Sequence, residues 1–260
     1  MIRTGPMNPP IFLLNLPKQK AYNRLEEEQV MIEHIESNLI KIRGKVATAA
    51  AKAGREPKEI IIVAVSKTFS IEAIEVLLNC GITDIGESKV QEAEPKIAAL
   101  GKAARWHMIG HLQTNKVKRA IDLFDLIQSV DTMKVAEEIN IVGEKLGKKV
   151  DCLLEINSSG EMTKSGVPPS MALNLVRSVM ELGQINLCGL MTIGPLSDDP
   201  EHVRRAFRLT RELYERSKEI VGESFRWLSM GMSGDYETAI EEGSNMVRIG
   251  TAIFGRRLSE

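Results

Sequence analysis

The chain has 260 residues, a length typical of one α/β barrel, with enough residues to bury a large core without disulfides. Its 34 Lys and Arg residues nearly balance its 35 Asp and Glu residues, and only 4% of the residues are aromatic. This composition argues against partners such as nucleic acid or an anionic membrane, and against a surface on which bases stack. The three cysteines form no CxxC motif and no even set, which predicts a reducing, cytoplasmic location.

The first 28 residues differ from the rest of the chain. The apolar run at 11–16 is too short to span a membrane, and no small-residue cleavage site follows it. Prolines at four positions disfavour a helix, namely Pro6, Pro9, Pro10 and Pro17. We therefore expect residues 1–28 to be a disordered extension, or sequence upstream of a true start near Met31.

From residue 29 onward the pattern alternates between helices and strands. Apolar residues on one side predict a first helix at 29–54, which Gly54 ends. Short apolar runs predict eight strands, at 60–65, 84–87, 106–110, 126–130, 150–157, 187–194, 225–231 and 246–250. Helical patterns predict connections at 70–80, 89–100, 115–121, 132–146, 169–182, 200–221 and 235–242.

Eight strands, each but the last followed by a helix, predict an α/β fold with a parallel sheet closed into a (β/α)₈ TIM barrel over residues 29–260. An open, doubly wound sheet is the alternative, but no GxGxxG follows the first strand. Only about ten residues follow the last strand, too few for a full helix. We expect the helix at 29–54 to cover that gap or the adjoining floor of the barrel.

Lys67 follows the buried first strand directly, in the run IIIVAVSKT. A lysine is costly to bury without a partner, so its position needs an explanation. Its ammonium could reach the rim while its aliphatic stem packs below. Alternatively, it could be a Schiff-base lysine, whose amine must be partly desolvated to act as a nucleophile at neutral pH.

The loops after strands seven and eight have the features of a phosphate site. The first contains Ser233 between two glycines, and the second is Gly250-Thr251-Ala252. In TIM barrels phosphate often binds at these two loops, where glycines allow close backbone approach and a helical turn begins. Ordinary capped turns are the alternative. Arg248 has the strand parity of Gly250, so it could point inward near the same site, or outward to a helix carboxylate. A P-loop is excluded because Arg256-Arg257 stands where Gly-Lys-Ser/Thr is required.

Several segments over about residues 31–257 resemble, in order and with normal spacing, the pyridoxal phosphate homeostasis proteins of the YggS/PROSC type. These segments are VSKT at 65–68, IGESKVQEA at 85–93, HMIGHLQTNK at 107–116, EINSSGEMTKSG at 155–166, GLMTIGP at 189–195 and LSMGMSGDYETAIEEGSNMVRIGTAIFG at 228–255. The last segment is very specific.

The resemblance implies the fold type III barrel that binds pyridoxal 5'-phosphate (PLP), similar to the N-terminal domain of alanine racemase. It implies that Lys67 carries the PLP aldimine, that Ser233, Gly250 and Thr251 hold the phosphate, and that Arg248 faces the pyridine nitrogen. One departure is Ser88, where the family usually has asparagine, which puts a direct cofactor contact there in doubt.

Other polar residues near the strand ends are weaker candidates. His107 and His111 are four apart, but HExxH is absent and Gly110 disfavours a helix, so we expect no metal site. Glu87 and Glu155 end strands two and five, where they could do acid–base work or be neutralised by a neighbouring lysine. His111, with Asn115 and Lys116, could line the barrel mouth or cap a helix. The cysteines Cys80, Cys152 and Cys188 are expected in the core.

Three functions remain open from the sequence. The resemblance implies a PLP carrier in cofactor homeostasis with little or no turnover, whose expected partners are PLP, amino acids and apoenzymes that require PLP. The chain ends at Glu260, so we expect it to lack the β-domain that supplies the second base in racemases. We expect a monomer or weak dimer. A PLP-dependent racemase-like enzyme with Tyr236 or His111 as base, and a Schiff-base aldolase using Lys67 alone, are the alternatives.

Overall fold

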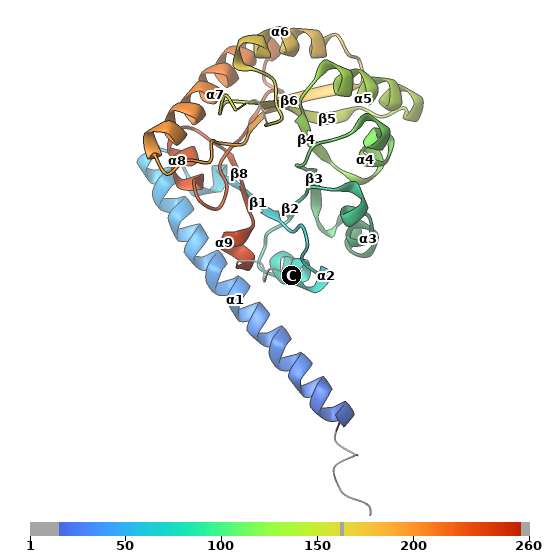
Figure 1. Cartoon of the computed structure of the whole chain (residues 1–260), viewed down its shortest axis with the longest axis vertical. Coiled ribbons are helices and arrows are strands. Elements are labelled where there is room, and N and C mark those ends of the chain that lie inside the picture. Colours follow the sequence, from blue (N-terminus) through green and yellow to red (C-terminus); the bar gives the residue numbers. More distant parts are fainter. Residues whose placement is uncertain (1–15, 162–163, 256–260) are drawn as a thin grey trace, which may run out of the picture.

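The computed structural model describes the backbone of residues 16–161 and 164–255, and side chains from residue 29 onward within those ranges. Eight parallel strands pair in chain order, and the last pairs with the first, which confirms the predicted closed (β/α)₈ barrel (Figure 1). The strands are β1 (Ile61–Val65), β2 (Asp84–Glu87), β3 (Arg105–Met108), β4 (Leu126–Val130), β5 (Val150–Ile156), β6 (Ile185–Thr192), β7 (Trp227–Ser229) and β8 (Met246–Ile249).

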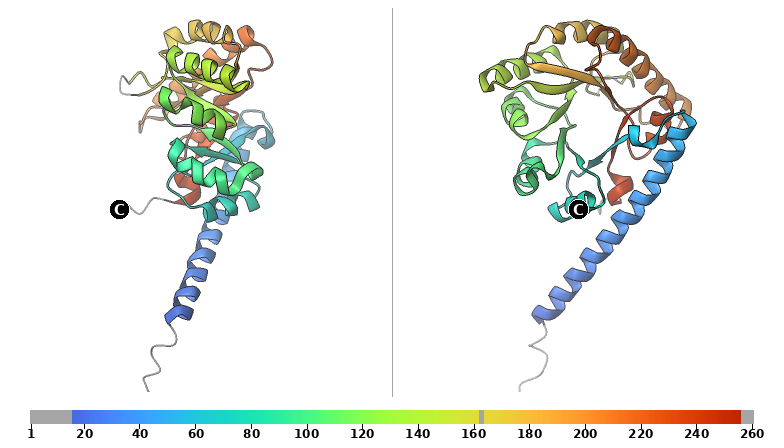
Figure 2. Two further views of the ribbon diagram at one scale, coloured as in Figure 1. Left: turned by 90° about the vertical axis from the view of Figure 1, so that its right-hand side faces the viewer. Right: turned by 180° about the vertical axis from the view of Figure 1, so that it is seen from behind.

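Helices surround the barrel on its outer side, as Figures 1 and 2 show. The α-helices are α1 (Leu16–Lys52), α2 (Ile71–Asn79), α3 (Val90–Leu100), α4 (Val117–Leu123), α5 (Met133–Leu146), α6 (Pro169–Met180), α7 (Pro200–Val221), α8 (Tyr236–Glu241) and α9 (Thr251–Phe254), with short 3₁₀ turns η2 (Pro57–Glu59), η3 (Gly101–Ala103) and η4 (Thr114–Lys116). Hydroxyl caps begin two of them: Ser70 Oγ accepts from Ala73 N at α2, and Thr132 Oγ1 accepts from Val135 N at α5, both at 3.4 Å.

Helix α1 begins earlier than the sequence predicted. Its backbone is helical from Leu16 rather than from residue 29, which differs from the disordered extension expected over residues 1–28. Pro17 did not prevent this because it lies in the first turn, where a helix needs no donor from that backbone nitrogen. Residues 1–15 lie outside the described part of the chain.

The C-terminal half of α1 fills the position of an eighth outer helix. It contacts α8, α9 and α2, and its buried face includes Ile35, Leu39, Ile42 and Val46. Of the two positions expected for this helix, the gap left after β8 and the adjoining floor of the barrel, these contacts favour the gap. The N-terminal part of α1 extends past the barrel (Figures 1 and 2).

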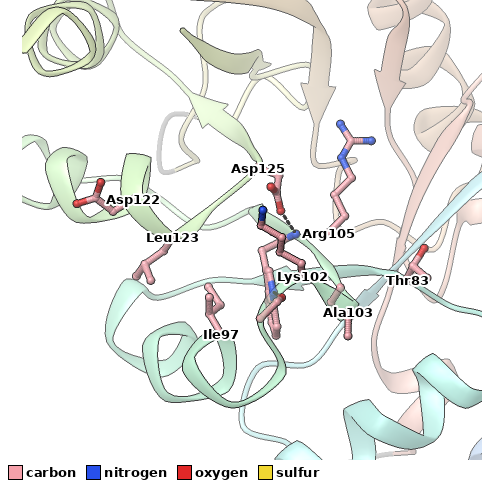
Figure 3. A pocket seen from close by; sticks show the side chains of 11 residues that line it. Thr83, Ile97, Lys102, Ala103, Arg105, Asp122, Leu123 and Asp125 are labelled. Atoms are coloured by element: carbon pink, nitrogen blue, oxygen red, sulfur yellow. Dashed lines mark hydrogen bonds between the residues drawn. The ribbon is translucent and has the colours of Figure 1, made fainter. Parts of the chain in front are cut away.

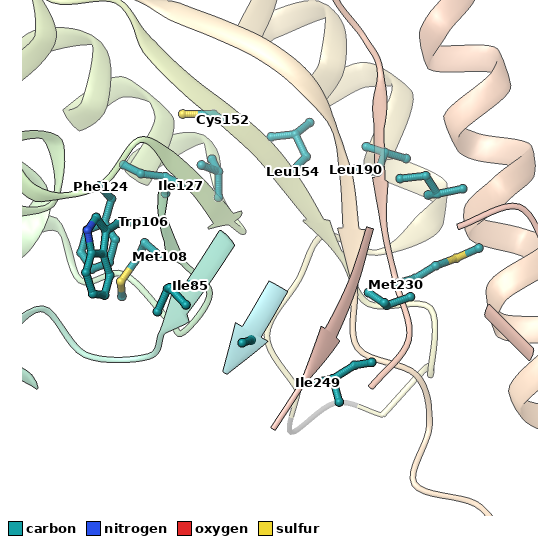
Figure 4. Packing of buried hydrophobic residues seen from close by; sticks show 14 of the residues in the cluster. Ile85, Trp106, Met108, Phe124, Ile127, Cys152, Leu154, Leu190, Met230 and Ile249 are labelled. Carbon is teal, nitrogen blue, oxygen red and sulfur yellow. The ribbon is translucent and has the colours of Figure 1, made fainter. Parts of the chain in front are cut away.

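Two apolar layers stabilise the barrel. The larger lies between the strands and the helices, where side chains such as Trp106, Ile127 and Leu190 pack (Figure 4). A smaller layer fills the barrel interior and consists of Val63, Leu126, Leu153, Cys188, Met191 and Met246. Because strand side chains alternate between faces, Glu155 shares the inward parity of Leu153, and Arg248 that of Met246.

The cysteines lie in apolar surroundings, as expected. Cys152 and Cys188 are buried, Cys80 is partly buried against the core, and none of the three forms a disulfide. Within the described helices, no segment is long and apolar enough to cross a membrane.

Candidate functional site

The structure brings the five predicted site residues into one pocket at the carboxyl ends of β1, β7 and β8. Lys67, Ser233, Arg248, Gly250 and Thr251 all line a cavity of about 300 Å³. This is the face where active sites of such barrels lie, and the volume falls at the lower end of the usual range for small-molecule sites. That these residues bind a cofactor stays a prediction.

Lys67 projects from a tight turn at the end of β1. Phe69 N donates to Ser66 O at 3.0 Å across this turn, and Thr68 has a φ of 69°. Among the described residues, Thr68 is the only non-glycine with a positive φ, an uncommon conformation for a β-branched residue. The surrounding contacts therefore hold the backbone beside Lys67 in a conformation it would not adopt alone.

A buried cluster lies directly beneath this turn. Lys96 Nζ, on α3, donates to Ser66 O at 2.7 Å and to Glu87 Oε1 at 2.6 Å, and Ser66 Oγ donates to the same carboxylate oxygen at 2.6 Å. Ser66 and Glu87 are fully buried, and Lys96 is nearly so. Glu87 is thus neutralised by a lysine and faces α3 rather than the barrel mouth. The sequence left two roles open for Glu87, acid–base chemistry or an ion pair with a neighbouring lysine. The structure favours the ion pair.

Ser233 links the two loops of the predicted phosphate site. Its Oγ accepts from Gly250 N and from Ala252 N, each at 3.2 Å, so its own hydroxyl proton remains available to an anion. The loop returns sharply at Gly231, whose φ is 95°; a Cβ there would lie 2.6 Å from the Ala239 Cβ. Glycine is therefore required for the loop to turn back onto α8.

Arg248 points into the barrel, which was one of the two orientations that its sequence position left open. It is 4% exposed, and its guanidinium donates to Ser229 O at 2.9 Å, to Ser229 Oγ at 2.7 Å and to Thr192 O at 2.7 Å. Burial lowers the pKa of Arg248 to about 10, although the nearby carboxylates Glu155 and Asp235 oppose that effect. The pocket thus has a buried cation in its floor.

Acidic residues lie on the β4–β5 side of the barrel mouth. Glu155 is 4% exposed, and burial, followed by the charge of Asp131, raises its pKa to about 7. Asp131 Oδ2 is 2.9 Å from His111 Nδ1, while its buried Oδ1 has no hydrogen-bond partner among the described residues. His111 therefore lies at the mouth, but paired with Asp131 and outside the lining of the Lys67 pocket.

The remaining candidates lie apart from the pocket. His107 is fully buried, with ring nitrogens near Asp84 and Gln128, so it does not meet His111. Among the residues that the structure describes, no group of His, Cys, Asp and Glu could hold a metal ion. Tyr236 is buried in α8 and does not line the pocket.

At least three cavities on the described part of the barrel are larger than the Lys67 pocket, and two of them lie at opposite ends of its strands. One of them, about 620 Å³ in volume, is lined by residues at the amino ends of three strands (Figure 3). Thr83 directly precedes β2, Arg105 begins β3, and Asp125 directly precedes β4. This cavity therefore opens at the amino ends of these strands, opposite the face of Lys67. The other, about 650 Å³, is lined by Lys164 and Asp235 and shares Met232 and Gly234 with the Lys67 pocket.

Comparison with known proteins adds to this geometry. The family model described as "Alanine racemase, N-terminal domain" matches residues 37–257. A protein of Aquifex aeolicus named pyridoxal phosphate homeostasis protein is 41% identical over 220 residues, covering 84% of this chain and 96% of the relative. A protein of the same name from Pasteurella multocida is 38% identical over 227 residues, covering 86% of this chain and 97% of the relative.

Several solved structures have the same barrel fold as this chain. A protein described as unknown from Bifidobacterium adolescentis has a TM-score of 0.82 and 35% identity, covering 86% of this chain and 96% of that one. The structure of PipY from Synechococcus elongatus with PLP bound has a TM-score of 0.73 and 30% identity, covering 85% and 100%. Alanine racemase from Clostridium difficile, at 17% identity and a TM-score of 0.71, shares the fold; the match covers 88% of this chain and 61% of the racemase.

Proposed function

Because this chain belongs to the family of pyridoxal phosphate homeostasis proteins, which has the alanine racemase N-terminal domain, we propose that it binds PLP and acts in the homeostasis of that cofactor. The observation that carries this proposal is the convergence of Lys67, Ser233 and Arg248 on one pocket. An amine, an anion site and a buried cation are the groups that an aldehyde with a phosphate arm and a pyridine ring requires.

The residues present fit that cofactor. We propose that Lys67 holds it covalently, and that the Ser233 hydroxyl, with the backbone at Gly250 and Thr251, holds its phosphate. The support is that Ser233 Oγ lies 3.2 Å from two backbone nitrogens of the second loop and keeps its own proton free. Ser88 does not line the Lys67 pocket, so we do not assign it to the site.

Arg248 supports a carrier rather than a catalyst. When bound, PLP supplies an electrophilic carbon and a ring that withdraws electrons, and withdrawal is strongest when the ring nitrogen is protonated. We propose that Arg248 faces that nitrogen. A buried guanidinium disfavours a second positive charge beside it, so Arg248 keeps the nitrogen neutral and weakens the electron sink.

A role with little or no turnover follows from the same site. The two residues considered as a second base are poorly placed, since neither Tyr236, which is buried in α8, nor His111 lines the Lys67 pocket. We propose that the protein works in the cytoplasm as a monomer or weak dimer. Its further partners would be amino acids and apoenzymes that require PLP.

The first experiment tests the cofactor and its attachment. Protein loaded with PLP should show a visible absorption band, and borohydride reduction should leave the added mass on the peptide containing Lys67. Both signals should vanish in Lys67→Ala and persist in the control Lys116→Ala, which removes a partly buried lysine at another loop. A colourless protein that cannot be loaded would contradict the proposal and favour the Schiff-base aldolase.

The second experiment tests turnover. Loaded protein is incubated with L-alanine, D-alanine and other amino acids, while hydrogen exchange at Cα and product enantiomers are followed. General base catalysis typically contributes 10²–10⁴-fold, so without a placed second base we expect only a trace of racemisation. Sustained turnover at about 1–10³ per second would favour the racemase-like alternative.

A further inference from the structure

A chain of hydrogen bonds, buried except at its Asp84 end, crosses the barrel interior and ends on Arg248. Arg248 Nη1 donates to Ser229 Oγ at 2.7 Å, and Ser229 Oγ is 2.7 Å from Gln128 Oε1. Gln128 Nε2 is 2.8 Å from His107 Nδ1, and His107 Nε2 is 2.9 Å from Asp84 Oδ1. The chain thus runs from β8 through β7, β4 and β3 to the first residue of β2.

The direction of each bond follows from the two groups that it joins. A guanidinium can only donate, so Ser229 Oγ accepts from Arg248, and an amide oxygen can only accept, so Ser229 donates its proton to Gln128 Oε1. The amide nitrogen of Gln128 therefore faces His107 and donates to Nδ1. His107 must then carry its proton on Nε2 and donate it to the Asp84 carboxylate. All four bonds point from the cation at one end to the anion at the other.

The protonation states agree with this direction. His107 is fully buried, and burial lowers its pKa, with the bond to Asp84 opposing that effect. A neutral imidazole is what the chain requires. Charged groups around the far end are Arg105, whose Nη1 lies 3.9 Å from Asp84 Oδ1, and Asp125, which acts on His107 through space. At the near end they are Glu155 and Asp235.

Arg248 depends on neutral partners for its position. Its three hydrogen bonds end on two carbonyl oxygens and one hydroxyl, and in the described chain no carboxylate lies within 4 Å of its guanidinium. A buried charge without an ion pair is costly, and hydrogen bonds polarised in series strengthen one another in a low-dielectric interior. Ser229 Oγ is the acceptor through which the chain reaches Arg248.

We propose that Asp84, His107, Gln128 and Ser229 form a positioning chain that fixes the orientation of Arg248, and through it the electrostatic environment of the cofactor ring. This inference rests on the proposed function for the identity of the ring. It assigns a role at the cofactor to residues on β2, β3 and β4 that do not line the pocket.

The first test needs no cofactor. Nitrogen NMR of the full-length protein labelled at histidine should show His107 as the neutral Nε2–H tautomer at pH 7, and still neutral at pH 6. An Nδ1–H tautomer or an imidazolium would overturn the chain. This measurement stands whether or not the protein binds PLP, so its failure is distinct from failure of the proposed function.

The second test compares two fully buried serines after loading with ¹⁵N-labelled PLP. Ser229→Ala breaks the chain at Arg248, whereas Ser217→Ala removes a hydroxyl that bonds only to Leu213 O within α7. Ser229→Ala should move the ring-nitrogen resonance and release PLP about fivefold faster, as expected for one lost hydrogen bond. Ser217→Ala should do neither.

Further variants decide between positioning and a general loss of structure. Gln128→Met keeps the volume but breaks the middle of the chain, so it should move the ring-nitrogen resonance in the same direction as Ser229→Ala. Ser229→Thr keeps the hydroxyl, so its ring-nitrogen resonance should stay at the position found in the unmutated protein. In each variant, borohydride labelling of Lys67 should persist. Equal spectra for Ser229→Ala, Gln128→Met and Ser217→Ala would overturn the inference. Absence of Lys67 labelling in the unmutated protein would instead contradict the proposed function.

Discussion

Phe69 stacks on Phe254, with ring centroids 4.1 Å apart and planes inclined by 17°. The contact joins the turn that carries Lys67 to the end of α9, the helix that begins at Thr251. Two segments that are far apart in the sequence are thereby held at a fixed spacing. That spacing matters if one holds the aldehyde of PLP and the other its phosphate.

The first prediction concerns this stacked pair. Phe69→Ala and Phe254→Ala should each accelerate PLP release, and a double-mutant cycle on the free energy of unfolding should give a coupling of about 0.5–1.5 kcal/mol. Urea unfolding and stopped-flow release measure the two effects. Additive effects, with no coupling, would mean that the two segments are held together by other contacts.

The second prediction concerns the buried pair beneath Lys67. Lys96→Met leaves the Glu87 carboxylate buried without a cation and should lower the free energy of unfolding by about 3–5 kcal/mol. Adding Glu87→Gln should recover much of that loss, because the uncompensated charge is removed. The exposed pair of Lys148 and Asp122 is the control, since Lys148→Met should cost at most about 1 kcal/mol. Similar losses for the two lysines would contradict the buried pair.

The barrel fold could be predicted from the sequence because strands and helices are recognised from patterns within short stretches of the chain. The alternation after residue 29 predicted all eight strands, and TIM-barrel geometry then placed the ends of β1, β7 and β8 side by side. The predicted bounds of β2 and β4 agree with the structure, whereas both ends of β6 and of the three-residue strand β7 differ by two residues. The start of α1 was wrong because Pro17 was taken as a helix breaker, although it falls in the first turn.

The side chains that contact the Lys67 turn and Arg248 could not be predicted from local sequence patterns. The pairing of Glu87 with Lys96 depends on the direction of two side chains from different elements. The chain through Gln128 and Ser229 depends on polar residues facing inward, and the register of β4 against β5 shifts between Ile127 and Val130, so simple alternation fails there. A polar residue inside an apolar strand, as in LIQSV, was the available signal.

The third prediction tests the anion site. Ser233→Ala and Thr251→Ala each remove a hydroxyl donor to a charged group, which is worth about 1.5–3 kcal/mol. PLP should then dissociate roughly tenfold or more faster, measured by transfer to an excess of an apoenzyme that binds PLP. Thr210→Val, which removes a buried hydroxyl that bonds to Ala206 O within α7, is the matched control. Unchanged release from both site variants would place the phosphate elsewhere.

The fourth prediction concerns the N-terminal segment. The part of α1 nearest its start extends past the barrel, so a chain that begins at Gln29 should bind PLP normally and lose no more than about 0.5 kcal/mol of unfolding free energy. By contrast, Leu39→Ala, on the buried face of the same helix, should cost about 2–5 kcal/mol. A large loss on removal of residues 1–28 would show that they pack against the protein.

The last prediction concerns the pH dependence that Glu155 imposes. Burial raises the pKa of this carboxyl from 4.5 to about 7, so between these pH values the folded protein binds more protons at Glu155 than the unfolded chain does. The free energy of unfolding should therefore fall as pH rises through that window and level off above it. The total change is on the order of 3 kcal/mol.

Glu155→Gln should remove this dependence, because an amide stays neutral at every pH. Relative to the unmutated protein, the variant should become more stable as pH rises from 5 to 8, as measured by urea unfolding at each pH. Asp131, His111 and Arg248 act on the same carboxyl and are unchanged in the comparison. The exposed residue Glu137 supplies the control, since Glu137→Gln should leave the slope unaltered. A constant difference between Glu155→Gln and the unmutated protein would show that Glu155 is already ionised in the folded state at pH 5.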